Sequence, residues 1–191
     1  MLCLPSYREG FSLISFLAAN RSLYEANVFL YGGWNDANFL DTAYLYSGTT
    51  QEWVLLDMPS TNEPLKRSAH DMAELNGNTN SVVLMGGATT TELNGGITND
   101  VWEYITDTNK WQKQIDYSIH DLNAPKPRQF HRLATLYFSN QKLIALFGGV
   151  GKLKNMNDHW ILDCNTDNNW KWFQLPSNLS AAIPRARNAH T

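Results

Sequence analysis

Short apolar runs of strand length recur along the chain and alternate with polar turns. Runs rich in Leu, Phe and Ala lie at residues 11–18 and 133–138. Runs dense in Val, Leu, Ile and Phe, as expected for strands covered on both faces, follow at residues 27–31, 81–85 and 142–147. A third set, each member leading into a polar cluster that favours a hairpin turn, lies at residues 42–46, 100–105 and 158–162. The pattern predicts an all-β chain of short antiparallel strands.

These runs belong to a repeat with a period of about 60 residues. Each copy opens with an arginine, at Arg8, Arg67, Arg128 and Arg187. The third residue after it is Phe11 in the first copy and a histidine in the others, at His70, His131 and His190. The three full copies continue with a Gly pair, an Asp, an aromatic residue and a Trp, which we align as Asp41, Asp100 and Asp158; Tyr44, Trp102 and Trp160; and Trp53, Trp111 and Trp170.

The Gly pair follows the second apolar run of each copy, at Gly32-Gly33, Gly86-Gly87 and Gly148-Gly149. Glycine tolerates positive φ and leaves room for a neighbouring backbone, so it suits a tight exit from a crowded centre. The fourth strand of each copy opens with its Trp. Four antiparallel strands per copy form one propeller blade, and we expect each Trp to pack between adjacent blades.

The five elements in this order resemble the Kelch motif, over residues 5–191. The resemblance implies a Kelch-type β-propeller segment of about three four-stranded blades, at residues 8–57, 67–116 and 128–176, with the start of a fourth at 185–191. Because propellers have about 4–8 blades, we expect an incomplete ring. The chain is then a piece of a longer propeller, a truncated product, or an arc that closes by self-association through open blade edges.

Charge and composition exclude several classes of partner. The net charge of −3 and the absence of a Lys/Arg stripe argue against nucleic acid, and no apolar run reaches the ~18–20 residues of a membrane span. Cys3 and Cys164 form no disulfide framework, which favours a reducing compartment and a cytoplasmic location. Residues 11–19 also resemble the apolar part of a signal peptide, so secretion stays open, although Arg8 and its following residues keep the repeat register.

The sequence offers no catalytic constellation, metal site or cofactor motif. No histidine has zinc-ligand spacing. Residues 163–168 begin like a calcium-binding loop but lack its Gly, and residues 148–152 fail as a phosphate-binding loop. Some Kelch-like enzymes bind iron through Glu, Asp and His spaced four apart, and here Glu103 and Asp107 are followed by Trp111. We therefore predict no enzyme. The alternative is a fragment of an enzymatic or sugar-binding propeller whose site lies in missing blades.

A binding surface remains, and the resemblance implies a protein–protein interaction module. In Kelch propellers the arginine at the head of the first strand can line the central mouth and bind acidic side chains of a partner, which nominates Arg8, Arg67, Arg128 and Arg187. The alternative is that these arginines, like the histidines, bridge blades through backbone groups. Trp34, in one of the long loops, is a candidate interface anchor or packs on its own loop. We expect a protein or peptide partner with an acidic motif.

Overall fold

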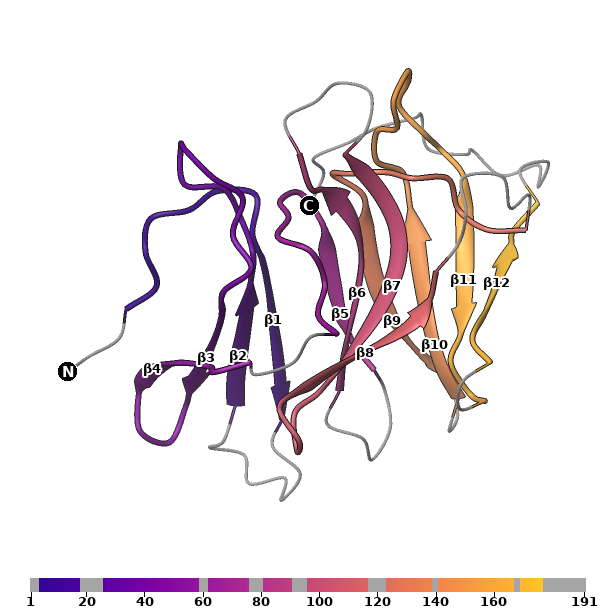
Figure 1. The fold of residues 1–191 in the computed structure, drawn as a ribbon. Helices are drawn as coiled ribbons and strands as arrows, with labels where there is room; N and C mark the ends of the chain where they lie inside the picture. Colours follow the sequence, from indigo (N-terminus) through magenta and orange to yellow (C-terminus); the bar gives the residue numbers. More distant parts are fainter. Residues whose placement is uncertain are drawn as a thin grey trace.

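The computed structural model describes residues 4–17, 26–58, 62–75, 81–90, 96–116, 123–138, 141–166 and 169–176. These residues form three four-stranded antiparallel sheets (Figure 1). Blade 1 contains β1 (Ser12–Leu17), β2 (Ala26–Tyr31), β3 (Ala43–Ser47) and β4 (Glu52–Leu55). Blade 2 contains β5 (Asp71–Glu74), β6 (Ser81–Ala88), β7 (Ile97–Ile105) and β8 (Lys110–Ile115). Blade 3 contains β9 (Arg132–Phe138), β10 (Gln141–Phe147), β11 (His159–Asp163) and β12 (Lys171–Gln174).

The all-β prediction and the count of three four-stranded blades are confirmed. Within the described residues the three sheets do not close into a ring. The expected start of a fourth blade at 185–191, with Arg187 and His190, lies outside the described residues. No helix in the part of the chain that the structure describes is long and apolar enough to cross a membrane.

The blades stand side by side in chain order, with their first strands adjacent (Figure 1). Their apolar side chains form two clusters, one at each interface between blades. Blade 1 meets blade 2 through a cluster of Phe16, Phe29, Tyr31, Ala43, Met72, Val82, Leu84, Trp102, Tyr104 and Trp111. A larger cluster between blades 2 and 3 includes Val83, Met85, Leu146, Trp160, Leu162 and Trp172. Each blade is therefore stabilised mainly by its neighbours, as in other repeat folds.

Asp71 links the first strands of all three blades. Its carboxylate accepts hydrogen bonds from Ser12 Oγ of blade 1 at 3.2 Å and from the Leu133 backbone N–H of blade 3 at 2.7 Å. Arg132 of blade 3 lies 3.3 Å from the same carboxylate. Because the Asp71 side chain is buried, these contacts are what compensate for the loss of its water shell.

The end of the blades at which each second strand finishes and each first strand begins is called the loop end here. The loops after β2 and β10 lie there, at the top of Figure 1, and the turns between third and fourth strands lie at the opposite end. The Gly pairs sit at this end with positive φ, and Gly87, at φ 96°, shows why. A Cβ on Gly87 would lie 2.7 Å from the Ser68 carbonyl oxygen and 2.8 Å from His70 Cβ.

The tryptophans that we expected between blades do not all lie there. Trp111 is 4% exposed and packs between blades 1 and 2. Trp53 is paired with Tyr46 on the side of blade 1 that faces away from blade 2 and is half-buried. In blade 3 the register places Trp172 at the position of Trp111, opposite Leu162, so the alignment of Trp170 with Trp111 was wrong. The turn before β12 is three residues longer than the turn before β8, since Asp163 pairs with Lys171 whereas Ile105 pairs with Lys110. Both Trp170 and Trp172 are buried.

Candidate functional site

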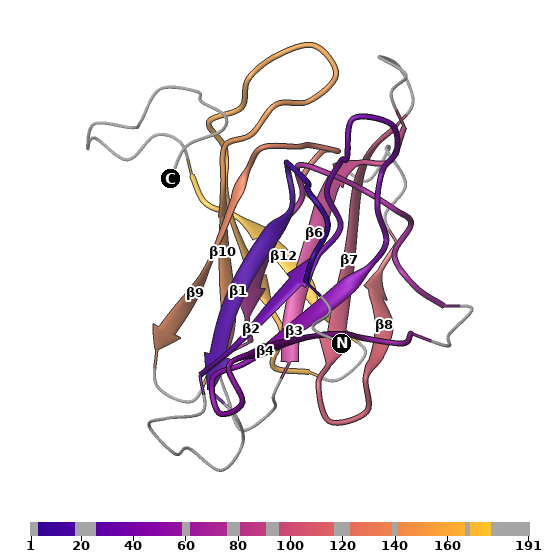
Figure 2. The same ribbon diagram turned by 90° about the vertical axis from the view of Figure 1, so that its left-hand side faces the viewer.

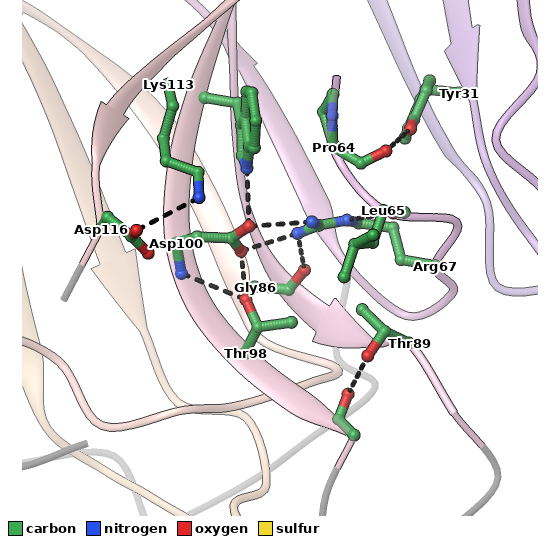
Figure 3. Close-up of polar contacts among 12 residues, drawn as sticks. Tyr31, Pro64, Leu65, Arg67, Gly86, Thr89, Thr98, Asp100, Lys113 and Asp116 are labelled. Atoms are coloured by element: carbon green, nitrogen blue, oxygen red, sulfur yellow. Dashed lines mark hydrogen bonds and ion pairs between the residues drawn. The ribbon is translucent and has the colours of Figure 1, made fainter. Parts of the chain in front are cut away.

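The repeat arginines head the first strands at the loop end, and their side chains point into the blades. Arg67 donates from Nη1 to the Gly86 carbonyl at 2.9 Å, and from Nη1 and Nη2 to the two oxygens of Asp100 at 2.8 and 2.9 Å (Figure 3). Its Nε donates to the Leu65 carbonyl at 2.9 Å. The Arg67 side chain has 0% of its surface exposed. A bidentate pair of this kind uses the guanidinium as a fixed fork.

Arg128 repeats this arrangement one blade further on. It donates to the Gly148 carbonyl at 2.9 Å and to both oxygens of Asp158 at 2.7 Å, and its side chain is also 0% exposed. The arginine backbones reach the preceding blade, because the Arg128 carbonyl accepts from Gly87 N–H at 2.9 Å and the Arg67 carbonyl from Gly33 N–H at 2.8 Å. Each arginine thus joins the Gly pair and third strand of its own blade to the Gly pair of the blade before it.

The carboxylates of these pairs are ionised by their surroundings. Burial alone would raise the pKa of Asp100, but hydrogen bonds and charge from Arg67, with hydrogen bonds from Thr98 and Trp102, hold it below its ordinary value. The pKa of Asp158 is also lowered: burial opposes this, and Arg128 and Trp160 outweigh burial. The indole N–H of Trp102 donates to Asp100 at 2.6 Å. Two N–H donors of one guanidinium and an indole N–H therefore satisfy one partly buried carboxylate in each of blades 2 and 3.

Blade 1 differs, and our alignment of Asp41 with Asp100 and Asp158 was wrong. The strand register places Tyr44 opposite Leu30, as Trp102 lies opposite Leu84. Counting back two residues gives Thr42, whose Oγ1 accepts from Arg8 Nη1 at 3.3 Å. Asp41 is exposed. Arg8 retains the bond to the Gly32 carbonyl, at 3.0 Å, and its guanidinium carbon lies 5.0 Å from the centre of the Tyr44 ring.

The arginines nominated for partner binding differ little in exposure where the structure describes them. Arg67 and Arg128 have no exposed side-chain surface, and their donors are occupied within the fold. Arg8 is 8% exposed, and Arg187 lies outside the described residues. The geometry of Arg67 and Arg128 matches the alternative that we left open, a bridge between blades. Their nomination as partner-binding residues stays a prediction, and other side chains at the loop end are exposed.

The repeat histidines are also buried at the loop end. His70 and His131 are 5% and 2% exposed. A Cβ on Gly32 or Gly86 would lie 2.9 Å from Cε1 of His70 or His131, so each ring fills the space left by a glycine of the preceding blade. Burial, followed by the charges of Arg67 and His131, lowers the pKa of His70 well below its ordinary value, so it is neutral at pH 7. Within the described ranges no three His, Cys, Asp or Glu side chains group to hold a metal ion.

Large apolar side chains are exposed at the loop end and form what we call the loop-end set. Leu65 and Phe130 flank the buried arginines of blades 2 and 3 and are 68% and 42% exposed. Leu153, in the loop between β10 and β11, is 91% exposed. Leu4 and Tyr7, which precede blade 1, and Phe11, which precedes β1, are also exposed, and we include them in the set. Apolar groups gathered at one end of a scaffold are a feature of interaction sites.

Trp34 lies beside this set and is half-buried. Its backbone pairs with Glu9, donating to it at 2.8 Å and accepting from it at 2.9 Å. Its ring packs edge-on against Phe39 of the same loop, with centroids 4.9 Å apart. Ala88 and Val150 make the same backbone bridge in the other blades, so the indole is particular to blade 1. Packing on its own loop is therefore present, and the role of Trp34 as an anchor stays a prediction.

A backbone ladder that the sequence did not reveal crosses the three blades at this end. Gly10, Ala69 and Phe130 stand two residues after the arginines and have φ of 60°, 55° and 55°. Ala69 N–H donates to the Gly10 carbonyl at 2.6 Å, and Phe130 N–H donates to the Ala69 carbonyl at 2.8 Å. Only Gly10 is a residue type that suggests positive φ, so the sequence carried one signal in three. A bulky residue such as Phe130 is held there at a cost in backbone strain.

The comparison with known families agrees with this architecture. The model of the KLHDC2/KLHL20/DRC7 Kelch-repeats domain matches residues 18–191. None of the curated proteins matches the chain. Kelch-repeat domains are typically protein-interaction modules. Three features of the structure agree with this match. An arginine precedes each first strand, the Gly pairs lie at the loop end, and the four-stranded blades pack through aromatic interfaces. The chain belongs to the Kelch-repeat family.

Proposed function

We propose that the chain binds a protein or peptide partner through its loop end and catalyses no reaction itself. The observation that carries the proposal is the loop-end set, six exposed large apolar side chains on the segments that precede and connect the strands. Phe130 is a step of the backbone ladder and Phe11 directly follows Gly10, another step, so hydrogen bonds between blades hold the backbone at or next to both residues. Rigid aromatic side chains bind with little loss of conformational entropy, which favours them as anchors.

Charges around the loop-end set favour a partner with an acidic segment. Exposed lysines surround blades 2 and 3 at this end, at Lys66, Lys126, Lys152 and Lys154. Exposed carboxylates lie over blade 1, at Glu9, Asp36 and Asp41. Since lysine is a flexible point charge, these residues orient an acidic segment and increase its association rate more than they hold it tightly. We expect a segment that places its acidic residues over blades 2 and 3 and its apolar residues on Leu65, Phe130 and Leu153.

This proposal places the attraction for acidic groups on lysines, because Arg67 and Arg128 are buried in ion pairs with Asp100 and Asp158. An enzymatic or sugar-binding propeller with its site in other blades remains the second candidate. It predicts that the chain binds a small molecule, and that substitution of the apolar loop-end residues leaves this binding unchanged. The two candidates therefore differ in which side chains control binding.

Selection from a peptide display library on the immobilised chain tests the proposal. We expect enriched peptides that combine apolar anchors with acidic residues. The variant Phe130→Ala should weaken a selected peptide at least about tenfold, the effect of losing a central aromatic anchor. Tyr137→Ala is the matched control, because Tyr137 is equally aromatic, is 73% exposed and lies near the far end of β9, the strand that Phe130 precedes.

The outcome that contradicts the proposal is equal weakening by Phe130→Ala and Tyr137→Ala, or enrichment of peptides with no shared composition. The charge of the site is tested separately by the double variant Lys152→Glu and Lys154→Glu. It should slow association of an acidic peptide and reduce the dependence of association on salt.

A further inference from the structure

The loop between β10 and β11 folds into a short hairpin that runs from Val150 to Asn155 and is called the blade 3 hairpin here. Val150 and Asn155 form a β-bridge, and Gly151 N–H donates to the Lys154 carbonyl at 3.1 Å. At the base, Val150 and Gln129 exchange two backbone hydrogen bonds, at 2.8 and 3.0 Å. The hairpin stands above the ends of the strands, in orange at the top of Figure 2. Main-chain bonds therefore fix its base to the segment before β9, while its tip projects from the loop end.

The tip of the blade 3 hairpin presents a leucine between two lysines. Lys152, Leu153 and Lys154 are all exposed. Leu153 is 91% exposed, the highest value among the large apolar side chains of the described residues. It belongs to neither of the apolar clusters that join the blades. Its apolar surface is therefore removed from water only when another molecule covers it.

Blade 1 forms a hairpin with the same hydrogen bonds, and it shows that the fold does not require a leucine at the tip. Asn35 N–H donates to the Asn38 carbonyl at 3.2 Å, the counterpart of the tip bond in blade 3, so Ala37 stands at the position of Leu153. Ala37 and the residues on either side of it are exposed, although blade 2 follows blade 1. An exposed tip is therefore a property of the hairpin itself and does not depend on which element follows the blade.

The two hairpins carry opposite charges. The blade 3 tip has Lys152 and Lys154, whereas Asp36 takes the place of Lys152 in blade 1, with Glu9 and Asp41 exposed on the same blade. A partner that covers the blade 3 tip is therefore favoured if carboxylates surround its apolar contact, because complementary charges speed association and like charges suppress wrong partners. An anionic lipid surface fits this end less well, since it would also face the carboxylates of blade 1.

We propose that the blade 3 hairpin enters an apolar pocket of a folded partner protein, with Leu153 inside the pocket and Lys152 and Lys154 against carboxylates on its rim. The inference rests on the proposed function, since it concerns the same loop end, and it adds the kind of partner that this end selects. A side chain that projects is enclosed only by a concave surface, whereas an extended segment lying across the loop end touches one side of it. Leu153 then distinguishes folded partners from linear peptides, while Phe130 contributes to binding of both.

Binders selected on the whole chain from two display libraries test the inference. One library holds linear peptides, and the other holds small folded domains with a randomised concave face. Leu153→Asn should weaken the folded binders at least about tenfold and the linear peptides less than about twofold. Leu153→Met is the matched control, because it retains the apolar volume, and it should leave both classes unchanged. Replacing Lys152 and Lys154 together by Gln should slow association of the folded binders and reduce its dependence on salt.

The variants separate this inference from the proposed function. If Leu153→Asn weakens both classes of binder equally or leaves both unchanged, or if no folded binder is selected, the inference is overturned and Phe130→Ala still decides the proposed function. If Phe130→Ala leaves both classes unchanged, the proposed function itself fails. Leu153-dependent binding to phosphatidylserine vesicles would assign the hairpin to an anionic membrane and also overturn the inference. Far-ultraviolet circular dichroism establishes that each variant is folded.

Discussion

Blades 1 and 2 bury an arginine at the same position of the repeat, but they surround it with different side chains. In blade 2 the buried Arg67 faces a carboxylate, Asp100, which also accepts the Trp102 indole N–H. In blade 1 the equivalent Arg8 faces the Thr42 hydroxyl and lies over the Tyr44 ring. The bond from the arginine to the first glycine carbonyl of its pair is the same in both, at 3.0 Å in blade 1 and 2.9 Å in blade 2.

The comparison separates what the blade requires from what it tolerates. The arginine and the glycine carbonyl are present in all three blades, so they define the loop-end geometry. Blades 2 and 3 have both a carboxylate and a tryptophan at these positions, and blade 1 has neither. The carboxylate accepts the hydrogen bond of the indole N–H. A blade without the carboxylate would leave that N–H without this acceptor. Burial is deeper where the ion pair is present: Arg67 is 0% exposed and Arg8 is 8% exposed.

The largest effect is expected from removing the carboxylate charge in blade 2. Asp100→Asn leaves Arg67 buried without a counter-charge and should lower the free energy of unfolding by about 3 kcal/mol or more. Urea denaturation followed by tryptophan fluorescence measures the change. Asp41→Asn is the matched control, since Asp41 is the exposed carboxylate of blade 1, and it should change stability by less than about 0.5 kcal/mol. Equal effects of the two variants would contradict the assignment of Thr42 to the position of Asp100.

A smaller effect is expected from introducing the blade 2 chemistry into blade 1. Thr42→Asp gives Arg8 a carboxylate partner, and combined with Tyr44→Trp it also provides an acceptor for the new indole N–H. Hydrogen bonds to a charged group are worth about 1.5 kcal/mol or more, so the double variant should be more stable than Tyr44→Trp alone by about that amount. Differential scanning calorimetry compares the two. A double variant no more stable than Tyr44→Trp would show that the surroundings of Arg8 do not accept a charge.

The smallest effect concerns pH. The folded-state pKa values of Asp100 and Asp158 are lowered, so these groups contribute stability that is complete above their unfolded pKa of about 4 and is lost as pH falls through their folded pKa. Asp71 acts in the opposite direction, because burial raises its pKa. Denaturation at a series of pH values should therefore show that the stability gap between wild type and Asp100→Asn narrows below pH 4. A gap that stays constant down to the acid limit would mean that folding does not lower the pKa of Asp100.

The repeat and its blades could be predicted from the sequence because period, Gly pairs and aromatic positions are local signals. The error at Asp41 came from aligning by residue type. Asp100 and Asp158 stand two residues before their tryptophans, whereas Asp41 stands three before Tyr44, and that count would have identified Thr42. The second and third copies each have an Asp two residues before a Trp. That recurrence could have indicated that Arg67 is buried beside a carboxylate. The ladder through Ala69 and Phe130 could not, since neither side chain favours positive φ.

That ladder has a consequence for how such a surface changes in evolution. The hydrogen bonds between Gly10, Ala69 and Phe130 use only main-chain atoms, and the side chain at each step contributes nothing to them. A glycine, an alanine and a phenylalanine already occupy the three steps, at a conformational cost of about 1–2 kcal/mol for each residue that is not glycine. New recognition can therefore arise by single substitutions at the two exposed steps, Gly10 and Phe130, without dismantling the scaffold, and a designer who wishes to retarget the molecule would randomise these two positions first.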